Sequence, residues 1–270
     1  MAQDIQKCGG SVVKVDIREV WETDRRRIIE AGTVWTPETN VAVERLLWAS
    51  ILEEQISAGA RVDADWDSID AVIDTRWDVD LDSIRRREMV TRHDLKARLE
   101  ETLEVAQIDE ILHLGCTSAD IVENSYTIRQ QLALDYLLEL GASTTGCRLV
   151  FRGIKGPVGT QLDQLDLLGS MSAVMRMDQR VAATFGFTEV ANSVPQVMYR
   201  SQDLAWGTEI LVRVNWSEVG RAMATGYLGM LAGIAGTTWN EGDVSTSVVR
   251  RYAMPGLTEL AAVEQTRSNQ

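Results

Sequence analysis

The sequence predicts an all-α protein built from long helices, and its composition and apolar spacing carry that expectation. Only four of the 270 residues are proline, and residues that favour helices, such as leucine, alanine, glutamate and arginine, are plentiful. Several stretches place apolar residues three and four positions apart, as on one face of a helix. We expect an N-terminal helical domain over 1–110, a central helical bundle over 111–256 and a flexible tail over 257–270.

Capping residues predict where the helices begin and end. Thr36 followed by Pro37 predicts the start of a helix that ends near Gly59. Thr117 to Asp120 has the form of a capping box, which predicts the start of a further helix. The remaining expectations are an irregular segment over 1–30, one helix begun by Asp82 and Ser83 and carrying Leu95, Leu99, Leu103 and Ala106, a helix over 161–185, a loop over 191–203 and helical structure over 206–236.

Charge and cysteine content limit the classes of partner. A net charge of −13 at pH 7 argues against a general nucleic-acid-binding protein, because phosphate repulsion would be offset only locally. Cys8, Cys116 and Cys147 form no CxxC pair, so the sequence predicts neither a disulfide framework nor a zinc site. We therefore expect a protein of the reducing cytoplasm that holds no metal and no cofactor.

One uncharged segment, Ala222–Thr238, raises the question of a membrane. It is shorter than the roughly 20 apolar residues that span a bilayer, and glycine and threonine dilute it. The first ten residues also lack the apolar core of a signal peptide. We expect a buried helix here and no membrane segment.

The stretch Thr91–Asn124 contains both histidines of the chain. His93 falls away from the apolar stripe of its predicted helix, which favours a surface or site position over a core position. Arg92 and Asp94 flank it, and Thr117 with Ser118 would present free backbone amides at a helix N-terminus. Groups of these kinds can bind an anion and transfer protons.

Ser247 and Arg251 lie four residues apart, on one face of a helix that Asp243 can cap. A hydroxyl and a guanidinium near a helix N-terminus suit a phosphate or carboxylate. A solvated arginine pair at a helix end explains the same pattern equally well. The glycine-rich run GPVGT lacks the GK[ST] ending of a phosphate-binding P-loop, so nucleotide triphosphate binding is not indicated.

Taken together, several segments resemble adenylosuccinate lyase, a family of the fumarase/aspartase superfamily, and they occur in the family's order. They are VWTPETNVAVERLLWASILEEQ, TRHDLKARLEE, HLGCTSADIVEN, RGIKGPVGTQLDQLDLLG, NSVPQVMYRSQD and WNEGDVSTSVVRR. The resemblance implies a long-helix bundle of the fumarase/aspartase type and a homotetramer whose sites combine segments of three subunits. It also implies β-elimination of fumarate from adenylosuccinate to yield AMP, and from the related succinyl-carboxamide intermediate.

The resemblance assigns a role to each candidate residue. His93 would transfer or position protons, and His113 matches the histidine that precedes the Thr-Ser pair. Thr117 and Ser118 would hold a carboxylate. The further substrate contacts implied are Arg92, Asp94 and Gln161, with Ser247 and Arg251 gripping the nucleotide phosphate.

The chain also departs from the family pattern. Between Leu140 and Arg152 it lacks the segment with the Thr-His motif, whose histidine is the leading general-acid candidate. Between Arg213 and Trp216 it lacks the Ser-Ser-x-Met-Pro-x-Lys loop that carries the base, and the C-terminal helical domain is absent beyond Gly256. Two hypotheses follow: an adenylosuccinate lyase-like C–N lyase in shortened form, or a non-catalytic helical scaffold that keeps the fold's core.

Overall fold

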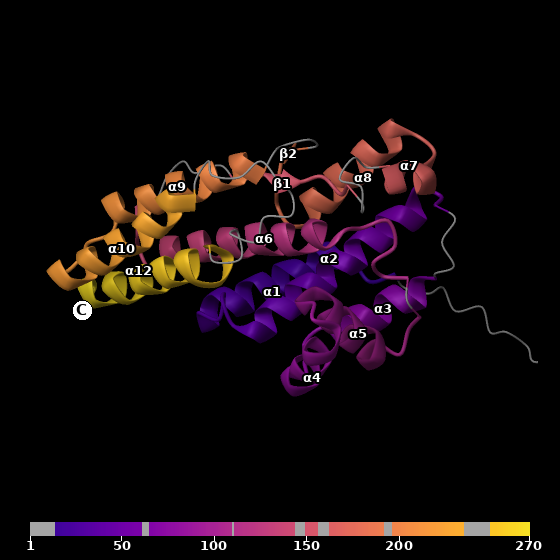
Figure 1. The fold of residues 1–270 in the computed structure, drawn as a ribbon, viewed down its shortest axis with the longest axis horizontal. Coiled ribbons are helices and arrows are strands. Elements are labelled where there is room, and N and C mark those ends of the chain that lie inside the picture. The colour runs from indigo at the N-terminus through magenta and orange to yellow at the C-terminus, as the bar shows by residue number, and fades with distance from the viewer. Residues whose placement is uncertain are drawn as a thin grey trace, which may run out of the picture.

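The computed structural model describes residues 14–60, 65–109, 111–143, 149–155, 162–191, 196–234 and 249–270. These residues confirm the all-α expectation, because most of them are helical (Figure 1). The sheet found among them is a short parallel pair of strands, β1 and β2. The elements are α1 (Ile17–Ala31), α2 (Pro37–Ser57), α3 (Trp66–Asp74), α4 (Leu81–Thr91), α5 (Asp94–Ala106), α6 (Ser118–Glu139), β1 (Phe151–Arg152), α7 (Leu162–Leu168), α8 (Met171–Thr184), β2 (Val190–Ala191), α9 (Gln196–Arg213), α10 (Glu218–Ile234), the π-helical turn η1 (Val249–Ala253) and α12 (Met254–Ser268).

Helices α2 and α6 pack against each other at the centre of the molecule (Figure 1). Every residue from Val41 to Leu52 is buried, so α2 is enclosed on all sides, as expected for a helix that is apolar around most of its circumference. Thr36 caps α2 as predicted, with its hydroxyl accepting the amide of Thr39 at 3.2 Å. The core that surrounds these two helices includes residues from Ile17 to Ala262.

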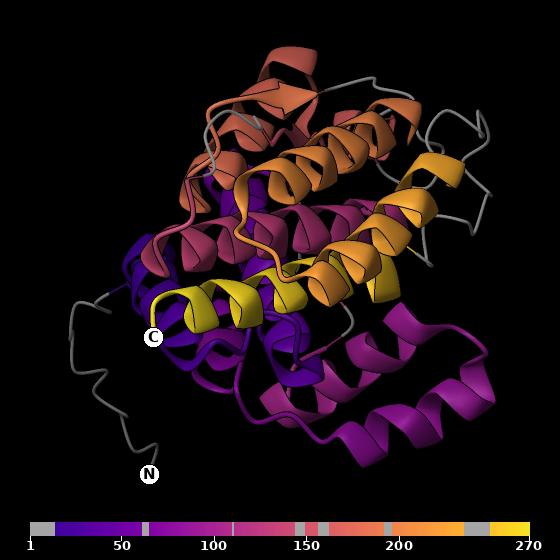
Figure 2. The same cartoon turned by 90° about the vertical axis from the view of Figure 1, so that its left-hand side faces the viewer.

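The expected single helix over the His93 region is wrong. Two helices, α4 and α5, form a hairpin set to one side of the bundle (Figure 2). Asp80 caps α4, and the chain turns at Arg92, whose φ of 56° is left-handed. His93 then caps α5. A new cap competes with continuation of the first helix, which apolar spacing alone does not reveal.

Four other expectations are corrected by local capping or packing. The segment before residue 31 contains α1, which buries Ile17, Trp21, Ile28 and Ile29. The helix expected over 161–185 divides at Gly169, where φ is 72°, and Ser170 caps α8. Helix α9 begins inside the expected loop over 191–203, and the segment 214–217 separates α9 from α10.

The expected flexible tail is helix α12, which packs against α6, α9 and α10. Met254, Leu257 and Ala261 lie on the face that it buries, and each is fully buried. Leu257 and Ala261 are four residues apart, so an apolar stripe stabilises the helix up to its end. The division of the chain into domains stays a prediction.

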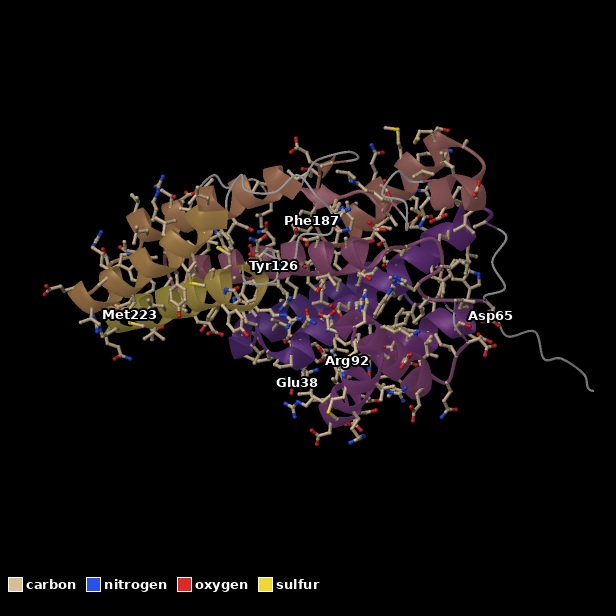
Figure 3. The ribbon with its side chains drawn as sticks, viewed as in Figure 1. Glu38, Asp65, Arg92, Tyr126, Phe187 and Met223 are labelled. Atoms are coloured by element: carbon tan, nitrogen blue, oxygen red, sulfur yellow. The ribbon has the colours of Figure 1, made fainter. Side chains whose placement is uncertain are left out.

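Helix α10 corrects the expectation of a buried helix over Ala222–Thr238. Ala224 and Leu231 are buried, but Met223 is 51% exposed and Met230 is 39% exposed. Figure 3 shows Met223 on the outer end of the molecule. Among the described residues, no helix has the length and apolarity to cross a membrane.

Candidate functional site

His93 stands at the N-terminus of α5, outside the core. Its side chain is 45% exposed, which agrees with the sequence-based expectation that it is not a core histidine. Its Nδ1 accepts the backbone N–H of Lys96 at 3.3 Å, and this contact caps the helix. A nitrogen that accepts a hydrogen bond carries no proton, so the neutral ring has its proton on Nε2.

The other nitrogen of His93 reaches the start of α6. Nε2 lies 3.1 Å from Oγ of Ser118, so its N–H donates to that hydroxyl. Ser118 is the first residue of α6, and the amide of Thr117 donates to the Asp120 carboxylate at 2.9 Å, as the predicted capping box requires. Two segments separated by 25 residues thus meet through one hydrogen bond.

Asp94 connects the same place to η1. Its Oδ2 lies 2.9 Å from Nη2 of Arg251, across 157 residues of sequence, and 3.5 Å from Nη1 of Arg98. Burial alone would raise the pKa of Asp94, but the charge of Arg98, the amide of Leu95 and the charge of Arg251 hold it below its usual value. The Asp94 carboxylate is therefore charged and paired at neutral pH.

A second ion pair, between Arg98 and Glu44, lies next to Asp94. Arg98 donates to both Glu44 oxygens, at 2.6 and 3.1 Å, and Asn40 donates to Glu44 at 3.2 Å. Sequence reasoning missed both Arg98 and Glu44. The one local signal for Arg98 is its i, i+4 spacing from Asp94. Glu44 has no such signal, because it lies within the apolar run of α2.

These ion pairs border a cavity of about 650 Å³ between the start of α2, the start of α5 and the C-terminal helices. Its charged lining consists of four carboxylates and three guanidiniums, and Trp35 and Tyr252 add aromatic faces. The charged residues are Glu44, Glu88, Asp94, Glu259, Arg98, Arg129 and Arg251. The guanidinium of Arg129 lies over the Trp35 ring at 5.1 Å. The cavity combines paired charges with flat apolar surfaces, which suits a ligand with an aromatic ring and polar substituents.

His113 lies close enough to His93 to be affected by its charge, but its surroundings differ. Burial lowers the pKa of His113 to about 4, and repulsion from His93 is the second, smaller cause of this shift. Its Nδ1 accepts the indole N–H of Trp48 at 3.1 Å. It lines a second cavity of about 510 Å³ together with Cys116 and Asp163. Burial raises the pKa of the Cys116 thiol well above its usual value, so this cysteine is not a nucleophile at neutral pH.

The structure does not bring every sequence candidate into this site. Arg92 is exposed at the junction of α4 and α5 (Figure 3), and among the described residues its side chain has no hydrogen bond or ion pair. Thr117 is half-buried beside Ser118. Gln161 and Ser247 lie outside the described residues, so their roles stay predictions. Within the described part of the chain, no three His, Cys, Asp or Glu side chains are grouped to bind a metal ion.

Comparison with known proteins adds no evidence on function to this geometry. No family model matches the sequence, and a search of curated proteins found no match.

Proposed function

We propose that this chain is an adenylosuccinate lyase-like protein with a shortened helical bundle of the fumarase/aspartase type. Its substrate site would lie where the N-termini of α5 and α6 meet η1. The observation that carries the proposal is that three segments that resemble the family converge there. His93 contacts Ser118 at 3.1 Å, and Asp94 contacts Arg251 at 2.9 Å. A homotetramer in the cytoplasm, binding adenylosuccinate, AMP and fumarate, belongs to the same proposal.

The start of α6 suits a carboxylate of the succinyl group. The Ser118 hydroxyl and the backbone amides of Ser118 and Ala119 are hydrogen-bond donors, while the capping box occupies the amides of Thr117 and Asp120. The helix dipole favours negative charge at this end. The Nε2–H of His93 adds a third kind of donor beside them. A carboxylate here would replace the hydrogen bond between His93 and Ser118 with contacts from both side chains.

In the proposed elimination, the C–N bond breaks while a base removes a proton from the adjacent succinyl carbon, and the departing nitrogen gains a proton. His93 can supply that proton from Nε2 only after its ring has become a cation. Protonated Nδ1 would lose the Lys96 amide and turn to Asp94, whose Oδ1 lies 3.7 Å away. Asp94 would then stabilise the imidazolium, as carboxylates beside catalytic histidines do.

A direct test is fumarate release from adenylosuccinate by the purified chain. We expect measurable release, and a fall of about a hundred- to ten-thousand-fold in His93→Gln, which loses the proton-transfer group. AMP should also raise the melting temperature, because ligands that bind the native state stabilise it. Absence of both fumarate release and an AMP-dependent shift would reject the proposal.

A second candidate, a non-catalytic helical scaffold, is favoured by the pairing of two of the three arginines that line the cavity. Arg251 is bound by Asp94 and Arg98 by Glu44, so these two guanidiniums are already neutralised by the protein's own carboxylates. Asp94→Asn tests this point because it removes the negative charge that faces Arg251. A scaffold would fold normally and show no stabilisation by AMP or fumarate, before or after that substitution. A binding site would gain affinity for a phosphate once Arg251 is released.

A further inference from the structure

Trp48 contacts His113 from the most enclosed part of the molecule. It lies in the middle of α2 and has no exposed surface. Its indole Nε1 donates to His113 Nδ1 at 3.1 Å, and the rings meet edge to face, with centroids 6.1 Å apart and planes at 79°. A fully enclosed indole has little freedom to turn, so this contact fixes the orientation of the imidazole.

The direction of this hydrogen bond follows from the chemistry of the donor. An indole nitrogen donates and never accepts, so His113 Nδ1 must be the unprotonated acceptor. The neutral ring therefore carries its proton on Nε2. A doubly protonated ring would set Nδ1–H against the indole N–H, so the contact also disfavours the cation, in the same direction as burial.

His93 is held in the same way by a different donor. Its Nδ1 accepts the Lys96 amide, which, like an indole, has only a proton to offer. Both histidines of the chain thus keep Nδ1 occupied as an acceptor and carry the proton on Nε2, which in His93 donates to Ser118. The same tautomer is stabilised at both histidines, by a main-chain amide at His93 and by a buried tryptophan at His113.

We propose that Trp48 is a positioning residue for His113, holding the imidazole as a neutral Nε2–H hydrogen-bond donor. This assignment deepens the proposed function and rests on it for the ligand: a part of the substrate that enters the second cavity, which His113 lines, would present an acceptor oxygen to His113 and would not lose a proton to it. The base of the elimination would then be another group. The tautomer itself does not depend on any ligand, so it can be tested separately.

The first experiment uses the intact chain, uniformly labelled with ¹⁵N. The protein has two histidines and eight tryptophans, so the imidazole signals are few enough to assign. We expect the proton of His113 on Nε2 at pH 7, and a scalar coupling across the hydrogen bond between Trp48 Nε1 and His113 Nδ1. Finding the proton on Nδ1 would overturn the assignment, whatever the outcome of the fumarate assay.

The second experiment compares Trp48→Phe with Trp77→Phe. Both remove an indole N–H and keep an aromatic ring, but Trp77 donates to Asp24, at 3.0 Å, and not to a histidine. We expect Trp48→Phe to mix the two tautomers of His113 and to raise its titration midpoint, while Trp77→Phe leaves both unchanged. An unchanged tautomer and midpoint in folded Trp48→Phe would contradict the proposal. If that variant does not fold, the coupling in the native chain decides.

Discussion

Two of the ion pairs formed by helix α5 differ in the access that they leave to solvent. At its start, Asp94 is 28% exposed and its partner Arg251 is 52% exposed, on the wall of the large cavity. Two turns later, Glu101 pairs with Arg45, and these side chains are 2% and 0% exposed. The first pair remains accessible to a ligand, whereas the second is sealed inside the protein.

The sealed pair is also fully satisfied by its surroundings. Arg45 donates to Thr102 at 3.1 Å and to the carbonyl oxygens of Thr75 and Asp78, while Glu101 accepts the amide of Asp80 at 3.0 Å. Such a network ties α2 and α5 to the segment that precedes α4, and it leaves no donor for a ligand. Burial and saturation together separate a structural ion pair from one in a site.

The largest predicted effect follows from breaking the sealed pair. Arg45→Met should reduce the free energy of unfolding by about 3–5 kcal/mol, because Glu101 would remain buried without its partner. Urea unfolding followed by circular dichroism measures this loss. Arg85→Met is the matched control, because Arg85 and its partner Asp82 are 71% and 75% exposed, and exposed pairs contribute little. Similar losses in the two variants would remove the distinction between sealed and accessible pairs.

His113 should make the protein sensitive to acid. Its pKa is about 4 in the folded state against 6.5 for an unperturbed histidine, so below pH 6.5 the unfolded chain binds a proton that the native chain does not. The contribution of His113 to the free energy of unfolding is fully present above pH 6.5, and this free energy falls by about 3 kcal/mol as the pH drops to 4. Denaturant unfolding at several pH values should show this slope flattened in His113→Phe and kept in His93→Gln. An equal slope in all three would contradict it.

A smaller effect is expected from the contact between α5 and α6. Ser118→Ala should cost about 0.5–1.5 kcal/mol, the usual contribution of one hydrogen bond, and should weaken any binding of fumarate. Ser172→Ala is the control, because Ser172 lies in the first turn of α8 and its hydroxyl faces Ser170. Isothermal titration calorimetry with fumarate distinguishes the two variants. Equal affinity in both would place the carboxylate elsewhere.

The smallest effect on stability should come from the accessible pair itself. Arg251→Ala should change the free energy of unfolding by less than about 1 kcal/mol, because Arg251 is half exposed. Arg267→Ala is a close match, since its partner Glu264 lies at 3.0 Å and Arg267 is 60% exposed. Only Arg251→Ala should alter an AMP-dependent shift in melting temperature. A large destabilisation by Arg251→Ala would make this pair structural too.

Local sequence signals predicted the parts of the fold that local chemistry controls. The cap at Thr36 and the capping box at Thr117 are correct, since a side chain and a nearby amide form each of them. The turn at Arg92 and the helix α12 were missed. The turn depends on competition between two helices for the same residues, and α12 depends on a surface supplied by α6, α9 and α10.

The same distinction applies to the site. His93, Asp94, Ser118 and Arg251 were candidates from the sequence, and the structure connects them in two contacting pairs. Glu44 was not a candidate, because it stands among apolar residues of α2 and its partner Arg98 is 54 residues away. Pairing across that separation is a property of the packed helices. Apolar periodicity along either helix does not encode it.

The cap on α5 joins the site to the main chain at Lys96. Because His93 Nδ1 accepts the Lys96 amide, any event that takes this nitrogen's lone pair releases that amide to water. A proton bound at His93, or a ligand that turns the ring, would therefore loosen the first turn of α5. Hydrogen exchange at the single backbone amide of Lys96 thus becomes a reporter of events at the histidine. What His93 binds can thus be followed at the main chain of α5.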